Sequence, residues 1–494
     1  MSYLLTAPEM VATAATDLDG IAAALYAANA AAAGPTTGLL AAAEDEVSRA
    51  IATLFGAFGQ EYQAVVTHAA AFHTEFTRAL AAAASAYAQA EATASNALSA
   101  FNTQVQTLLS PLLPNAGTGG TTPLTSIASP ATQVAFIMGG TAIPFPDEMY
   151  VTGAQTLFIQ PRFPGAVSNV LFTPEQFWPF TSSLGNLTLG RSVAQGLAVL
   201  SDAVNIQLST LGNGAVVFGY SQSAAIATIE IRNLMSLPTP PSPSDLAFVL
   251  TGNPNNPNGG ALQRFNGLYI PILDVLFNGS TPPDSPYPTV IYSNQYDGVA
   301  NFPQYPLNLL ADLNAIIGVV DGTHFYVGLT PDQVANAVRL PTSPDYTGNT
   351  QYYLVPTQKL PLTSLIRPIP YVGTAIAELI QPDLRVLVDL GYSDYGPGLS
   401  YANIPTPASF LSVPNPFAVS YYLAKGAVQG VQGSMVSLGW LPPSYTPTEY
   451  PYVPSVAPGV NIFLGQPSVT GLSLLTGALG TAAKDLGWIP PWWN

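Results

Sequence analysis

Residues 101–130 divide the chain into parts of different character. They are dominated by Pro, Gly, Thr and Ser, a composition typical of linkers between domains. Residues 1–100 are rich in Ala, whereas short β-branched runs alternate with helical patterns after the linker. A chain of 494 residues is also longer than one ordinary domain. We therefore predict a helical first domain, a linker and a second domain of another fold class.

Apolar residues recur at helical spacing in the first domain. Leu18 and Leu25 are seven residues apart, as in the seam of a coiled coil, and the Gly-Pro pair at Pro35 is expected to end this helix. Steps of three and four over residues 47–80 predict a second helix, and so a helical hairpin. Two helices leave one apolar side open. A partner's hairpin could complete a four-helix bundle, or the chain's own C-terminal domain could cover that side.

The residues after the linker predict a mostly parallel sheet in an α/β domain. Strand-like runs occur at residues 132–138, 215–218, 246–250 and 289–292. Helical patterns at 191–211 and 224–235 lie among them, and such alternation indicates βαβ units. We place this domain at residues 131–370. The Pro-, Tyr- and Gly-rich residues 371–494 form an extension to which the sequence assigns no separate function.

Charge and composition exclude several classes of protein. Only 8% of the residues are charged, and 12 Lys and Arg against 28 Asp and Glu give a net charge of −16, which argues against nucleic-acid binding. The longest apolar stretch, residues 21–33, is shorter than the roughly 18 residues of a membrane span. The absence of Cys and the presence of only three His argue against a metal centre. The N-terminus lacks the pattern of an ordinary secretory signal peptide.

Ser221 is the candidate nucleophile. It lies in Gly-Tyr-Ser-Gln-Ser, residues 219–223, between an apolar strand-like run and a predicted helix. A nucleophile elbow requires this strand–turn–helix context, which the other Gly-x-Ser sequences of the chain lack. The backbone N–H of Gln222 is the default oxyanion donor, and a second is expected from the loop that contains Gly140 and Thr141. Those glycines could also serve only to form a turn.

His324 is the candidate base, because it is the only His outside the hairpin. His68 and His73 are interpreted as solvated helix positions. Asp297 follows a strand-like run in an Asp-Gly turn and lies between Ser221 and His324 in sequence, the order of an α/β-hydrolase triad. Two rival acids remain, Asp321 in the turn before His324 and Asp312 in a helical pattern.

Residues 253–286 are long for a connection between two strands. We predict that part of this segment covers an acyl pocket. A position on the opposite face of the sheet would refute the prediction.

Two families resemble this sequence. Residues 1–100, with Pro8-Glu9 and the Tyr87-x-x-x-Glu91 motif, resemble the PE family of mycobacteria. Residues 134–370 resemble the PE-PPE domain, a serine α/β-hydrolase, in their MGGT, GYSQS, QYDG and GTHF motifs. The resemblance implies a cutinase-like α/β-hydrolase fold with Ser221, Asp297 and His324 as its triad, and no cofactor.

The resemblance also implies where the protein acts and with what. It implies export by a type VII secretion system, with Tyr87 and Glu91 as the signal, to the cell surface or beyond. It implies pairing of the hairpin with a PPE-family protein and esterase or lipase activity on acyl esters. Two alternatives stay open: the same triad could transfer the acyl group to a cell-envelope alcohol, or the fold could be a catalytically silent surface protein.

Overall fold

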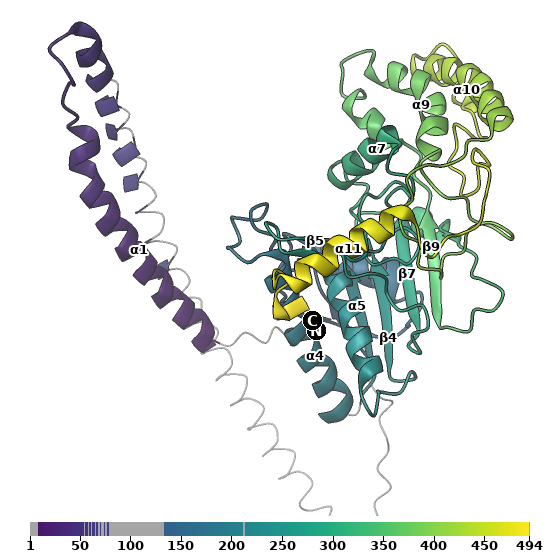
Figure 1. The fold of residues 1–494 in the computed structure, drawn as a ribbon, viewed down its shortest axis with the longest axis horizontal. Helices are drawn as coiled ribbons and strands as arrows, with labels where there is room; N and C mark the ends of the chain where they lie inside the picture. The colour runs from purple at the N-terminus through teal and green to yellow at the C-terminus, as the bar shows by residue number, and fades with distance from the viewer. Residues whose placement is uncertain are drawn as a thin grey trace, which may run out of the picture. The chain divides into compact units, whose positions relative to one another are not determined.

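The computed structural model describes residues 8–53, 55–57, 59–60, 62–64, 66–67, 70, 74, 77–78, 133–210 and 213–493 (Figure 1). The chain forms two compact units, Met1–Ser126 and Ile127–Asn494, which we describe separately. The predicted linker, residues 101–130, lies outside the described residues. None of the helices in the described part is long and apolar enough to cross a membrane.

The first unit contains the predicted helices. Helix α1 (Pro8–Thr37) runs two residues past Pro35, so the prediction that this proline ends it was wrong. The hydroxyls of Thr36 and Thr37 each donate at 2.7 Å to a backbone carbonyl of the preceding turn. Every described residue from 46 to 78 is helical. Tyr62 donates to the Asn29 side chain across the pair at 3.0 Å, and the two helices form the expected hairpin.

A seven-stranded sheet organises the second unit. Its strands are β1 (Val134–Ile137), β2 (Val167–Val170), β3 (Ala215–Tyr220), β4 (Leu246–Thr251), β7 (Thr289–Asn294), β8 (Val338–Arg339) and β9 (Thr350–Val355). Their order is β2-β1-β3-β4-β7-β9-β8, and every neighbouring pair is parallel except β8 with β9. The four predicted strands correspond to β1, β3, β4 and β7, and the α/β prediction is confirmed.

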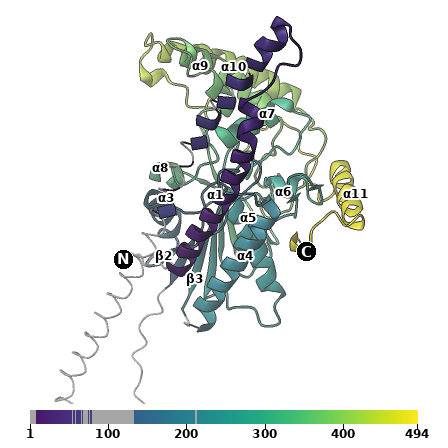
Figure 2. The same ribbon diagram turned by 90° about the vertical axis from the view of Figure 1, so that its left-hand side faces the viewer.

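Helices cover both faces of this sheet. Helices α4 (Leu189–Asn205) and α5 (Gln222–Ser236) lie side by side over one face (Figures 1 and 2). Helix α3 (Glu148–Gly153) and the π-helix η2 (Ala154–Ile159) cover the other face. Successive strand residues point to opposite faces, so Val217 packs in the α4–α5 core and Phe218 in the α3–η2 core.

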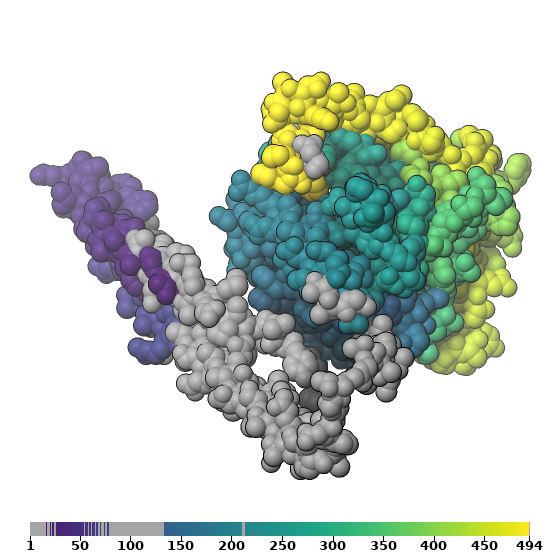
Figure 3. Space-filling model, turned by 90° about the horizontal axis from the view of Figure 1, so that it is seen from below, coloured from purple at the N-terminus to yellow at the C-terminus, as the bar shows by residue number. Residues whose placement is uncertain are grey.

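Helix α7 (Leu309–Val320), which lies between β7 and β8 in sequence, and the residues after β9 belong to the second unit and form no separate body. Helices α7, α9 (Gly373–Asp389) and α10 (Pro416–Ser437) cluster together in both ribbon views. Helix α11 (Gly471–Asp485) returns across the molecule, and the C-terminal residues pack along its body (Figure 3). Shorter elements are α6 (Ala261–Arg264), α8 (Pro331–Ala335), the β5–β6 hairpin (Tyr269–Ile270, Val275–Leu276) and the helices η3 (Ile206–Thr210), η4 (Pro361–Leu365), η5 (Pro443–Tyr445) and η6 (Pro491–Trp493).

Candidate active site

Ser221 occupies a tight turn between β3 and α5. Its backbone has φ 56° and ψ −114°, a conformation that non-glycine residues seldom adopt outside strained functional turns. A Cβ at Gly219 would lie 2.8 Å from the Ser223 carbonyl oxygen, so the turn requires glycine there. The Ser223 hydroxyl accepts the Tyr220 N–H at 2.9 Å and donates to the Tyr220 carbonyl at 3.1 Å. Ser223 therefore braces the turn that presents Ser221.

The three predicted triad residues meet at hydrogen-bond distance. His324 Nε2 lies 2.8 Å from Ser221 Oγ, and His324 Nδ1 lies 2.9 Å from both carboxylate oxygens of Asp297. Asp297 is fully buried and His324 is nearly so. Of the rival acids, Asp321 accepts the Thr323 N–H at 2.9 Å and shapes the turn, while Asp312 lies on α7. Asp297 is thus the acid that contacts the imidazole.

Tyr326 holds the Asp297 carboxylate, a role that sequence reasoning missed. Its hydroxyl donates to Asp297 Oδ2 at 2.7 Å and accepts the Asn294 N–H at 2.7 Å. The Val299 N–H donates to Asp297 Oδ1 at 2.8 Å. Burial, with the nearby carboxylate, raises the pKa of Tyr326 well above its ordinary value, so its hydroxyl keeps its proton and acts as a donor.

Gly252 makes room for the imidazole. It directly follows β4 and has φ 59°, a conformation that favours glycine. A Cβ there would lie 2.9 Å from His324 Cε1 and 3.0 Å from the ring of Tyr326. The sequence offered no sign of this role, because Gly252 begins a stretch rich in Asn, Pro and Gly that reads as a loop.

The three residues predicted for the oxyanion hole gather around Ser221. A Cβ at Gly140 would lie 3.1 Å from Ser221 Cβ, so the loop after β1 passes directly beside the serine. The Thr141 hydroxyl donates to the Gln222 side-chain oxygen at 2.9 Å, which ties that loop to the first turn of α5. The N-terminus of α5, which begins at Gln222, adds the positive end of a helix dipole. This arrangement can stabilise a negative charge that develops beside Ser221.

Glu175 is an uncommon buried acid near that loop. Its side chain is fully buried, its φ is 47°, and it accepts the Thr173 hydroxyl at 2.7 Å. Its carbonyl accepts the Ala142 N–H at 2.9 Å, which ties it to the loop that contains Gly140. Burial raises the pKa of Glu175 to about 8, so its carboxyl is protonated at neutral pH.

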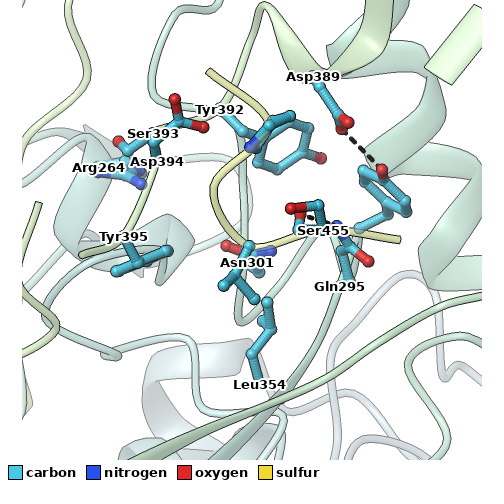
Figure 4. Close-up of a pocket in the computed structure, with 13 residues that line it drawn as sticks. Arg264, Gln295, Asn301, Leu354, Asp389, Tyr392, Ser393, Asp394, Tyr395 and Ser455 are labelled. Carbon is cyan, nitrogen blue, oxygen red and sulfur yellow. Dashed lines mark hydrogen bonds between the residues drawn. The ribbon is translucent and has the colours of Figure 1, made fainter. Parts of the chain in front are cut away.

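A small polar cavity lies behind the Asp297 loop (Figure 4). Its lining includes Tyr296, which directly precedes Asp297, and residues that follow position 371. The Tyr296 hydroxyl donates to Asp389 Oδ1 at 2.7 Å, and Tyr450 donates to Asp389 Oδ2 at 2.9 Å. Burial, opposed by the charge of Arg385, raises the pKa of Asp389 to about 6. The C-terminal residues therefore support the loop that carries the triad acid.

Two further predictions concern residues of the first unit and the segment 253–286. His68, His73, Tyr87 and Glu91 lie outside the described residues. In the 253–286 segment, Leu262 and Val275 pack on Ala225, one turn along α5 from Ser221. The cover that this segment is predicted to form over an acyl pocket stays a prediction.

Comparisons with known proteins agree with the resemblance. Residues 4–94 match the model of the PE family, and residues 164–393 match that of the PE-PPE domain. PE family protein PE3 of Mycobacterium tuberculosis is 54% identical over 99% of this chain and 100% of its own length. Esterase PE16 of the same species is 47% identical over 84% of this chain and 73% of its own length.

Two more distant likenesses complete the comparison. The SL1278 acyltransferase Chp1 of M. tuberculosis is 33% identical over 46% of this chain and 55% of its own length. A solved structure of a cutinase-like protein from Cryptococcus sp. is 18% identical, with a TM-score of 0.26, over 35% of this chain and 82% of that one.

Proposed function

The chain belongs to the PE family and carries a PE-PPE domain, and from this premise we propose that it is a serine ester hydrolase of the esterase or lipase type. The observation that carries the proposal is the unbroken line of contacts from Asp297 through His324 to Ser221, with Ser221 on a strained turn. The 47% identity to Esterase PE16 supports the same class of reaction.

The proposed reaction follows from this geometry. Ser221 Oγ attacks the ester carbonyl while His324 Nε2 takes its proton, and the buried Asp297 stabilises the imidazolium that forms. The oxyanion is held by N–H groups of Gln222 and of the loop at Gly140 and Thr141. His324 then returns the proton to the leaving alcohol, and water cleaves the acyl-enzyme by the same steps.

Acyl transfer is the second candidate. The likeness to the SL1278 acyltransferase Chp1 favours it, since an alcohol acceptor can replace water at the acyl-enzyme without any change in the triad. Products formed with and without an added acceptor lipid separate the two: new acylated lipid supports transfer, and free acid alone supports hydrolysis.

The proposal extends to export and pairing. Tyr87 and Glu91 are proposed as a type VII secretion signal, and the hairpin as the site that binds a PPE-family protein at or beyond the cell surface. Apolar side chains of the hairpin are exposed, among them Val47, Ile51 and Phe55. They support pairing, because a partner helix that covered them would remove apolar surface from water. Secretion of a Tyr87→Ala variant beside wild type tests the signal.

The activity test is a series of p-nitrophenyl esters of graded chain length. We expect turnover by the wild-type protein and a loss of about 10³-fold or more in Ser221→Ala, with the fold retained. Ser236→Ala, which makes the same change at an exposed serine at the far end of α5, is the matched control and should keep wild-type turnover. Turnover by Ser221→Ala equal to that of wild type would refute the mechanism.

A further inference from the structure

Helix α7 exposes all of its large apolar residues except Ile317. The buried side of the helix consists of Ala311, Asn314, Ala315, Ile317 and Gly318. Leu309, Leu313, Ile316 and Val320 share the opposite side of the helix at steps of three and four, and we call them the α7 stripe. Leu309 is 74% exposed and Val320 is 80% exposed, and the other two are also exposed. A surface helix ordinarily presents the reverse arrangement.

The α7 stripe leads directly to the candidate active site. Val320 ends α7, and His324 follows four residues later, with its N–H bonded to the Gly318 carbonyl at 3.0 Å. Phe325 is exposed beside His324. The loop that contains Gly140 passes beside Ser221 and continues to the exposed Phe145, whose ring stacks on Phe172 at 4.5 Å.

The charges around the stripe identify what could cover it. Asp312 is the one charged residue in the α7 sequence and is only partly exposed, and Asp321 lies just beyond the helix. The nearby Arg367 is paired with Glu378 at 2.6 Å, and both are mostly buried. Lys359 is exposed and lines the same hollow as Asp321. Among these described residues, two acids thus stand against one unburied cation, on a chain of net charge −16. The surface is complementary to an apolar, uncharged layer and not to an anionic one.

We propose that the α7 stripe, with Phe325, docks the protein on the surface of a neutral lipid layer and brings Ser221 to esters held in that layer. This inference rests on the proposed function for its substrate. The stripe inserts without electrostatic attraction, so docking should survive high salt and weaken when anionic lipid is added.

The test measures co-flotation of the full chain with phosphatidylcholine vesicles. The Ile316→Gln/Val320→Gln double variant removes two exposed apolar side chains, and we expect its partition to fall by about tenfold or more. Leu474→Gln/Leu479→Gln makes the same change at two exposed leucines of α11 and should bind like wild type. Hydrolysis of a soluble short ester should be the same in all three proteins.

Each outcome has one meaning. The proposal would be overturned if the two double variants floated equally, as they would if the hairpin alone bound the vesicles. Stronger binding to anionic vesicles than to phosphatidylcholine vesicles would also overturn it. A wild-type dimer that becomes monomeric in the α7 variant and ignores vesicles would assign the stripe to a second copy and also overturn it. Flotation that depends on α7 without any ester turnover would support docking and count against the proposed hydrolase.

Discussion

Buried residues around the triad confine Asp297 and His324 to one arrangement. Asp297 receives donors from His324, Tyr326 and the Val299 backbone, while Gly252 leaves space for the imidazole. Such contacts hold His324 with its Nε2 toward Ser221 Oγ, which is the orientation that the proposed mechanism requires of its base. The residues that orient the triad are therefore as testable as the triad itself.

Tyr326→Phe tests that orientation. We expect kcat to fall by about tenfold with KM unchanged, because one donor to Asp297 is lost, and stability to fall by about 1–3 kcal/mol, because the Asn294 N–H loses its acceptor. Kinetics on a soluble ester and urea unfolding measure the two effects. Tyr292→Phe, which removes a hydroxyl bonded to Arg162, is the control and should keep its kcat. An unchanged kcat in Tyr326→Phe would show that this bond does not orient the triad.

Glu175 should make stability depend on pH. Its pKa is raised from 4.5 to about 8, so between these values the folded chain holds a proton that the unfolded chain has lost. Stability therefore falls as pH rises through this window, by on the order of a few kcal/mol. Glu175→Gln should remove this contribution and become more stable relative to wild type at pH 8 than at pH 5, as urea unfolding at both values would show. A constant difference would contradict the buried, protonated state.

The three residues that the structure brings together, Ser221, Asp297 and His324, could be named from the sequence as a candidate triad, whereas the residues that surround them could not. Ser221, Asp297 and His324 each stand in a local motif, and scarcity of His left one candidate base. Tyr326 is one of 24 tyrosines, and its bond to Asp297 exists only after residues 297 and 326 are brought together by the fold. Glu175 gave no local signal either, because burial is a property of the packed unit.

The strands that are buried on both faces of the sheet were the ones that could be recognised in the sequence. Strands β3, β4 and β7 are buried throughout, and each contains a run of apolar and aromatic residues. Strand β2, Val-Ser-Asn-Val, lies at the sheet edge with most residues exposed, and β9 begins with polar residues, so neither gave a clear pattern. Residues 316–320 belong to α7, and their sequence does not show which side of the helix is buried, because Ile316 and Val320 are exposed whereas the adjacent Ile317 is buried.

The C-terminal helices should be needed for a stable active site. Asp389 on α9 accepts the hydroxyls of Tyr296 and Tyr450, so Asp389→Ala leaves two buried donors without an acceptor. We expect a loss of about 2–5 kcal/mol in the free energy of unfolding, together with lower ester turnover. Asp332→Ala, at an exposed acid on α8, should change neither. Wild-type stability in Asp389→Ala would mean that this cluster does not brace the Asp297 loop.

The division of the chain into two compact units sets the scale of the whole molecule. Each unit has its own packing, and the triad lies wholly within Ile127–Asn494. A protein that lacks residues 1–126 should fold and hydrolyse soluble esters within about twofold of the full chain, since domains with their own core fold alone. Thermal unfolding and a short-ester assay measure this. Aggregation or loss of turnover would show that the second unit depends on the first.

Covalent labelling by a fluorophosphonate probe tests the central claim most directly. The account predicts one adduct per chain at Ser221 at neutral pH, located by mass spectrometry of the digested protein. Labelling should be absent in Ser221→Ala and much slower in His324→Ala, because the imidazole activates the hydroxyl. A folded wild-type protein that takes up no probe at Ser221, or reacts equally fast without His324, would contradict the account.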